Sequence, residues 1–463
     1  MHRPVFAPAS SGPCKTHSDG RSATTSIGES ARSLVHWEPV IWIALAPLFP
    51  IHEWLGGLLA IAAIGRLCSL GPEGWLFLYL AGQPVVHAGL IAMEIDLPVL
   101  AITGLLTNAI CAGYWATTRK AIPVILTLVA FLAVFAVAAT AMLTTTNELT
   151  FLLEQRIQLF LSQALAAIQV ILIFARRSPR LDRLCVASGI TLCGVAGGMI
   201  LSGAALFSRM HDTPLIDWGR ASAMAALSFL VAAAFSARWR ATAYLGLGGV
   251  GSLLSVSQLL RQSAYAAVLS LAVCAVAFRH VHRFHLGRLM ASLGLAAFGV
   301  ALLQGDMLEE KLSRFLGRGD GAEVSNAARD KVAALATDMI QEQPIVGAGF
   351  GGFSRELGYD YYPHNMVLEI LCEFGVVGLV IGCLPVAFGM LLLRPRPDGP
   401  PGGEIALVSL MGFWTLVSQA SYSLPHSCAC FPGMLVAYLC WRRTQPPLSP
   451  AALGVQAPKL AAT

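Results

Sequence analysis

The sequence predicts an all-α integral membrane protein, a polytopic bundle of about 12–14 transmembrane helices with one large loop outside the membrane. Two observations lead to this prediction. Hydrophobic residues make up 56% of the chain and charged residues only 12%, whereas about a quarter of an average soluble protein is charged. The apolar residues also gather in runs of about 20, the length of a helix that crosses a bilayer. This composition excludes a disordered chain, a collagen-like chain and a small disulfide-stapled secreted domain.

The chain begins with a polar segment, residues 1–35, that is rich in Ser, Thr, Gly and Pro. It lacks the apolar core and cleavage site of a signal peptide, so we expect a disordered cytoplasmic tail. Residues 36–304 are predicted to form an N-terminal transmembrane bundle. The first apolar stretch, 39–66, is short for two spans and long for one, and prolines interrupt it. The clearer runs lie near 75–93, 98–117, 121–141, 158–175, 184–207, 218–236, 242–260, 263–278 and 287–304.

A second group of apolar runs predicts C-terminal transmembrane helices over residues 364–443. These runs lie near 365–393, 404–424 and 428–441. The Pro- and Ala-rich end, residues 444–463, is predicted to be another cytoplasmic tail. The 11 cysteines are scattered without CxxC spacing, so we interpret them as small apolar packing residues.

Six short clusters of basic residues separate the apolar runs. They are Arg119 with Lys120; Arg176, Arg177, Arg180 and Arg183; Arg238 with Arg240; Arg279, Arg283 and Arg288; Arg394 with Arg396; and Arg442 with Arg443. If each run crosses the membrane once, all six clusters lie on one side. The positive-inside rule makes that side cytoplasmic. Residues 305–363 then form a loop on the external side.

The external loop, 305–363, is predicted to contain an amphipathic helix and a glycine-rich segment. Ser325 can cap the helix, and Pro344 can end it. An apolar stripe at helical spacing runs between them: Val332, Leu335, Ala336, Met339 and Ile340. Arg329 lies near the expected N-terminus, where a cation is unfavourable. It therefore either pairs with Asp330 or another nearby acid, or faces an anionic ligand. The glycine-rich segment, 345–353, includes Gly347 and Gly349 and permits close backbone approach.

Polar residues cluster where this loop enters the apolar run at 365–393. His364 lies at the junction, and Asn365, Glu369 and Glu373 follow at four-residue spacing, which puts them on one helix face. A carboxylate at the centre of a membrane helix costs roughly 2.5–3.5 kcal/mol and usually faces a cavity or a partner. The bland alternative is a helix end with two snorkelling acids and an interfacial histidine. The two glutamates beside His364 favour a functional site.

Several segments resemble, in order, the O-antigen ligase and polymerase family of bacterial membrane glycosyltransferases. They are LRQSA at 260–264, Arg314 and Arg329 in the external loop, the glycine-rich segment, and PHNMVLEILCEFGVVGL at 363–379. The last is the closest match. Leu260 and Gln262 depart from the Ser and Gly that the family has on either side of its arginine, and a tryptophan that often follows the loop arginine is missing. The resemblance is specific over about 250–385 and topological elsewhere.

The resemblance implies a GT-C-like fold and a multi-pass protein of the bacterial inner membrane with its active site on the periplasmic face. It implies transfer of a glycan from an undecaprenyl diphosphate donor to a hydroxyl of lipid A-core or of a growing glycan. His364 would be the general base, a role that suits histidine because its ordinary pKa is about 6.5. Arg261 and Arg329 would act on the diphosphate, since arginine can bind phosphate oxygens in bidentate fashion.

Other residues are expected to bind substrate. They are Arg314, Asn365, Glu369, Glu373, Gly347, Gly349 and an upstream arginine, for which Arg209 and Arg220 are both open. Glu373 or Glu369 would orient His364. The external side has no Asp-x-Asp motif, so we expect no metal site and no cofactor. Besides the donor and the acceptor, we expect membrane lipids as partners. We expect no binding of nucleic acid.

Three other functions are alternatives to a ligase. A polymerase of the same family would use the same donor as a ligase. A polytopic transporter would share the topology and the intramembrane glutamates, but it predicts internal repeats and ionisable residues at mid-membrane. A scaffold without chemistry would leave the Arg, His and Glu cluster unexplained.

Overall fold

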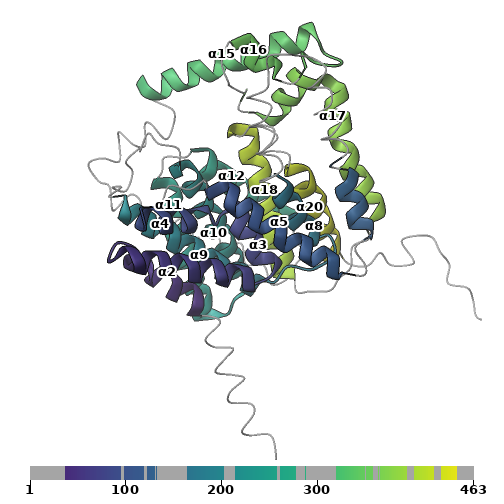
Figure 1. The fold of residues 1–463 in the computed structure, drawn as a ribbon. Helices are drawn as coiled ribbons and strands as arrows, with labels where there is room; N and C mark the ends of the chain where they lie inside the picture. The colour runs from purple at the N-terminus through teal and green to yellow at the C-terminus, as the bar shows by residue number, and fades with distance from the viewer. Residues whose placement is uncertain are drawn as a thin grey trace, which may run out of the picture.

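In the residues that the computed structural model describes, all regular secondary structure is helical and there is no strand (Figure 1). Those residues are 37–94, 99–118, 122–130, 132, 164–202, 214–257, 261–277, 287, 320–349, 351–357, 363, 365–393, 401–421 and 429–445. The predicted tails, 1–35 and most of 444–463, lie outside them, as does the start of the external loop. An all-α fold is therefore the structure of the described chain.

The bounds of 15 helices fall within the described parts of the chain. They are η1 (Ala46–Leu48), α2 (Glu53–Ser69), α3 (Pro72–Leu80), α4 (Gln83–Ala92), α5 (Val99–Thr117), α8 (Leu165–Ile173), α9 (Leu181–Leu201), α10 (Pro214–Phe235), α11 (Arg238–Ser257), α12 (Arg261–Ala277), α15 (Asp320–Glu342), α16 (Gly352–Leu357), α17 (Met366–Leu392), α18 (Pro401–Ser421) and α20 (Cys430–Thr444). The ambiguous first stretch forms two helices, Trp37–Leu48 and α2.

Three of the described helices are long and apolar enough to cross a membrane. They are Leu181–Leu201, Trp218–Phe235 and Met366–Leu392, and the pair α3 and α4 makes a fourth if its two helices, bent by 63°, form one span. Pro84 in the first turn of α4 explains the bend, because its ring nitrogen cannot continue the hydrogen bonding of α3. The full count of about 12–14 spans stays a prediction.

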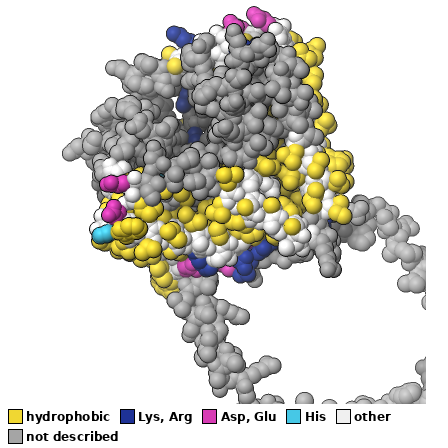
Figure 2. All heavy atoms as spheres, viewed as in Figure 1, with side chains coloured by type: hydrophobic (Ala, Val, Ile, Leu, Met, Phe, Trp, Pro, Cys, Tyr) yellow, Lys and Arg dark blue, Asp and Glu magenta, His cyan; other side chains and the backbone are white. Residues whose placement is uncertain are grey.

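One end of the bundle collects basic side chains, and we call it the basic end. Buried Glu73 of α3 lies 3.9 Å from Arg177 and 3.8 Å from Arg183, and its other oxygen accepts the Arg180 backbone N–H at 2.9 Å. A hydrogen bond from Arg180 to Asp182 and the charge of that carboxylate raise the pKa of the Arg180 guanidinium. Figure 2 shows basic and acidic side chains together at the lower edge, below a broad hydrophobic surface.

Arg443 of α20 brings a second basic cluster to the same end. Its side chain is 2% exposed and lies 3.4 Å from the equally buried Glu404 carboxylate of α18. The same guanidinium donates to the carbonyl oxygens of Phe174 and Ala175, just before the first cluster. A buried guanidinium is stable only when its charge and donors are paired. These contacts therefore fasten α8, α18 and α20 together at the basic end.

The neighbours of a third cluster, Arg238 with Arg240, place it at the basic end too. Gly402 lies two residues before Glu404, and a Cβ on Gly402 would contact the side chains of Phe235 and Leu181. Helix α11, which carries Arg238 and Arg240, begins just after Phe235. Three of the six predicted clusters thus share one end of the described structure. The other three lie outside the described residues, and the side of the membrane stays a prediction.

The helices α15 and α16 lie apart from the bundle, at the upper end of α17 in Figure 1. The lower part of α17 descends along the bundle beside α20: Gly382 faces Phe431 near the start of α20, and Gly389 faces Leu435 further along. Because α20 runs toward Arg443, α17 also runs toward the basic end. Its first residues therefore lie at the opposite end, and α15 and α16 pack there.

Candidate active site at the start of helix α17

Asn365 starts α17 as its N-cap. Its side-chain oxygen accepts the backbone N–H groups of Val367 at 2.9 Å and Leu368 at 3.1 Å, donors that have no partner within the helix. The cap fixes the point where the chain turns from Pro363 into the helix. The Asn365 oxygen is therefore engaged in capping, and its amide N–H groups are the part that can meet a substrate.

Glu369 and Glu373 lie on the same face of α17, one and two turns after the cap, as their spacing predicted. The structure buries both, at 0% and 1% exposure. Carboxylates removed from water to this extent are expensive unless they interact with donors or opposite charges. Their burial favours a functional interior site over snorkelling acids at the membrane surface.

Helix α17 breaks directly after these glutamates. Gly375 has φ 62° and ψ −164°, a conformation outside the helix region that only glycine adopts readily. The break leaves carbonyl groups before it and N–H groups after it without helical partners. Below the break, α17 is the exposed, apolar segment that passes along the bundle.

Pro344 and the glycine-rich segment that follows it supply the missing partners, and we call this contact the α17 joint. The N–H groups of Ala348 and Gly349 donate to the carbonyls of Cys372 at 2.8 Å and Glu373 at 3.0 Å. The N–H groups of Val376 and Val377 donate to the carbonyls of Pro344 at 2.9 Å and Ile345 at 3.1 Å. Four backbone hydrogen bonds thus hold the loop against the broken helix beside Glu373.

Two glycines make this approach possible. Gly347 has φ +70°, and a Cβ there would lie 2.5 Å from the Glu373 carbonyl carbon; a Cβ on Gly375 would lie 2.2 Å from the Ile345 oxygen. No side chain fits at either distance. The structure thus gives Gly347 and Gly349 a part in the joint, and their contact with substrate stays a prediction.

Helix α15 packs its predicted stripe on α16 and the start of α17. Val332, Ala336 and Met339 are buried in one cluster with Phe353 and Cys372. The expected start at Ser325 is wrong, because α15 already begins at Asp320. Ser325 therefore does not cap the helix, because the residues before it already belong to α15.

Arg329 consequently lies inside α15 and not in its first turn, so the unfavourable dipole does not apply. Its side chain is exposed and makes no ion pair with any other residue in the described part of the chain. Pairing with Asp330 is therefore not seen. Arg329 is three residues before Val332, so it extends the helix face that packs against α16 and α17.

Two predicted arginines lie in the N-terminal parts of helices that begin at the end opposite the basic end. Arg220 is buried, at 5% exposure, near the start of α10, which runs toward the basic end. Arg261 is the first residue of α12, which follows α11 after it has returned from the basic end. These helix directions place Arg220, Arg261 and the start of α17 at the same end of the bundle.

Three predicted site residues lie outside the described residues: His364, Arg209 and Arg314. The side chain of Arg261 is likewise not described. Their roles, and the choice between Arg209 and Arg220, stay predictions.

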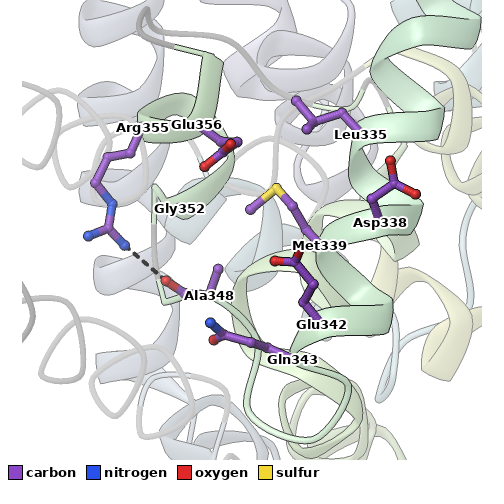
Figure 3. Close-up of a pocket in the computed structure, with 9 residues that line it drawn as sticks. All are labelled: Leu335, Asp338, Met339, Glu342, Gln343, Ala348, Gly352, Arg355 and Glu356. Carbon is purple, nitrogen blue, oxygen red and sulfur yellow. Dashed lines mark hydrogen bonds between the residues drawn. The ribbon is translucent and has the colours of Figure 1, made fainter.

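A polar pocket of about 310 Å³, which the sequence did not predict, lies between α15 and α16 (Figure 3). Its lining consists of Leu335, Asp338, Met339, Glu342, Gln343, Ala348, Gly352, Arg355 and Glu356. Arg355 donates to the Ala348 carbonyl at 2.9 Å. The acidic composition of the loop was visible in the sequence, but which acids meet depends on how α16 folds back onto α15.

Comparison with known proteins found a family model that matches part of the chain. The O-antigen ligase family model matches residues 219–383, a stretch that runs from Arg220 through Arg261, α15 and the α17 joint. The match supports assignment to the O-antigen ligase and polymerase family. No curated protein and no solved structure matches the chain.

Proposed function

We propose that this protein is a membrane glycosyltransferase that moves a glycan from undecaprenyl diphosphate to an acceptor hydroxyl on the periplasmic face of the bacterial inner membrane. The observation that carries the proposal is the buried pair Glu369 and Glu373, directly after His364 and Asn365, on a helix start that the glycine-rich segment holds in place. The family match over the same stretch supports a glycosyltransferase-like enzyme.

In the proposed reaction, His364 takes the proton of the acceptor hydroxyl. The acceptor oxygen then forms a bond to the sugar carbon while the bond from that carbon to the diphosphate oxygen breaks, with inversion. Negative charge grows on the leaving undecaprenyl diphosphate, so fixed cations at that position lower the barrier. Arg261 and Arg329 fill this role, with Arg314 and either Arg209 or Arg220 binding the donor. Glu369 or Glu373 orients His364. The arginines supply the charge that a metal would otherwise supply.

The acceptor defines two activities of the same site. A ligase transfers the finished glycan to lipid A-core, and a polymerase transfers it to the next lipid-linked unit. We favour the ligase, and the polymerase is the alternative. The buried pair and the joint serve either, because both reactions break the same bond in the donor.

Complementation of a host from which the gene has been deleted tests the proposal and separates the two activities. A gel of surface glycans would lack all long chains on the lipid core if the protein is a ligase. The gel would still show single repeat units attached to the lipid core if the protein is a polymerase. The intact gene should restore the pattern in either case. Unchanged glycans after deletion would contradict the proposal.

The proposed topology makes a separate prediction. Asp330→Cys on α15 should react with a membrane-impermeant maleimide added outside the inner membrane, because α15 would lie in the periplasm. Arg180→Cys at the basic end, 54% exposed, should react only after the inner membrane is opened. The unchanged chain gives the background from its own cysteines. The reverse labelling pattern would contradict the periplasmic site.

A further inference from the structure

The described residues that line the pocket between α15 and α16 include none of the proposed arginine and histidine residues, and the pocket has a different chemistry. Three carboxylates, those of Asp338, Glu342 and Glu356, and one guanidinium, that of Arg355, line it, so its net charge is −2. A surface with excess negative charge repels a diphosphate or an anionic lipid headgroup. The pocket is therefore unsuited to the end of the donor that the arginines bind.

The floor of the pocket is apolar and its rim is polar. Met339, 7% exposed, lies at the floor with Ala348 and Gly352. Figure 3 shows the carboxylates of Glu342 and Glu356 on either side of the Met339 thioether. Carboxylates accept hydrogen bonds from hydroxyls strongly, and the Gln343 amide both donates and accepts. An apolar floor under such a rim fits the C–H face and the hydroxyls of a sugar ring.

The spacing of the acids distinguishes a sugar from a metal ion. No three carboxylate, histidine or cysteine side chains among the described residues lie close enough to hold a cation, although three carboxylates share this pocket. Carboxylates that lie apart can each accept a hydrogen bond from a different hydroxyl group of one sugar. The volume of about 310 Å³ is at the lower end of ligand pockets, about 300–1,000 Å³.

A single residue, Ala348, connects the pocket to the start of α17. The Ala348 N–H donates to the Cys372 carbonyl in the α17 joint, while the Ala348 carbonyl accepts from Arg355 in the pocket. The pocket therefore adjoins the α17 joint, within reach of a glycan bound at the start of α17.

We propose that the pocket between α15 and α16 binds a neutral sugar of the glycan, away from the bond that reacts. This proposal rests on the proposed function and adds a saccharide subsite to it. The expected effect of the pocket is on glycan affinity and not on the chemical step.

Binding by the full-length protein in nanodiscs tests the subsite. The probe is the lipid-free repeat-unit oligosaccharide released by mild acid from the host's surface polysaccharide, titrated and followed by saturation-transfer NMR. Glu342→Gln and Glu356→Gln together should weaken binding at least tenfold. Asp330→Asn is the matched control, since it removes an exposed acid of α15 that does not line the pocket, and it should leave binding unchanged. Equal binding by the double variant and the wild type would overturn the proposal, as would an equal loss in the control.

Two further readouts separate this proposal from its rival and from the proposed function. Calcium binding that the double variant abolishes, and that competes with the oligosaccharide, would overturn the sugar subsite in favour of a cation site. In transfer assays, the double variant should raise the KM for the glycan with kcat retained. An unchanged KM would contradict the saccharide subsite but not the proposed glycosyltransferase activity. Oligosaccharide binding without any transfer would contradict the proposed activity but not the subsite.

Discussion

Gly375→Ala is expected to abolish most glycan transfer while the protein still inserts into the membrane. The new methyl group would lie 2.2 Å from the Ile345 oxygen, and Gly375 has a positive φ that alanine adopts only with strain of about 1–3 kcal/mol. The loop must move away, and the four backbone hydrogen bonds of the α17 joint are weakened or lost. A displacement of about 1 Å at a catalytic group can cost about 100-fold in rate. Glycan per unit of membrane protein, measured by gel, should fall at least tenfold.

Gly246→Ala in α11 and Gly113→Ala in α5 are the matched controls. Both glycines lie within helices, and a Cβ at either would meet no atom within 4 Å. These changes should leave glycan transfer near the wild-type level. Limited proteolysis supplies a second readout, because cleavage between α15 and α17 should increase only in Gly375→Ala. Wild-type transfer and proteolysis in that variant would show that the joint does not support the site.

His364→Ala is expected to have the largest effect on the chemical step. A positioned general base contributes about 10²–10⁴-fold to a rate, so initial rates of transfer should fall by a factor in that range. Substrate binding should persist, because the proposed donor-binding arginines and the proposed saccharide subsite are unchanged.

His364→Gln distinguishes a base from a structural residue at the same position. Glutamine can hydrogen-bond at similar length but cannot take a proton near neutral pH. It should therefore lose activity as fully as alanine, with normal membrane levels. Substantial activity in His364→Gln would assign His364 a positioning role and leave the base to another group.

Local features of the site could be predicted from the sequence because they depend on neighbours along the chain. The spacing of Asn365, Glu369 and Glu373 fixes them on one helix face, and the apolar stripe of α15 is buried as its period predicts. The start of α15 was misplaced because capping residues mark a possible helix start and do not prevent an earlier one.

The features that the sequence could not predict depend on contacts between distant residues. Gly375 lies in an apolar run, where a glycine usually serves helix packing; its break exists because residues 344–349 approach from another part of the chain. The pairing of Arg443 with Glu404 and the pocket around Met339 have the same origin. Each needs the tertiary arrangement, and neither leaves a periodic signal.

The most direct test of the proposed enzyme is transfer by the purified chain in nanodiscs. The donor is undecaprenyl diphosphate carrying the host glycan, and the acceptor is lipid A-core, with and without EDTA. We predict glycosylated acceptor and free undecaprenyl diphosphate in equal amounts, in both conditions, and loss of both products in His364→Ala. Folded wild-type protein that releases undecaprenyl diphosphate without glycosylating lipid A-core or a second lipid-linked unit, or that turns over neither substrate, would contradict a glycosyltransferase.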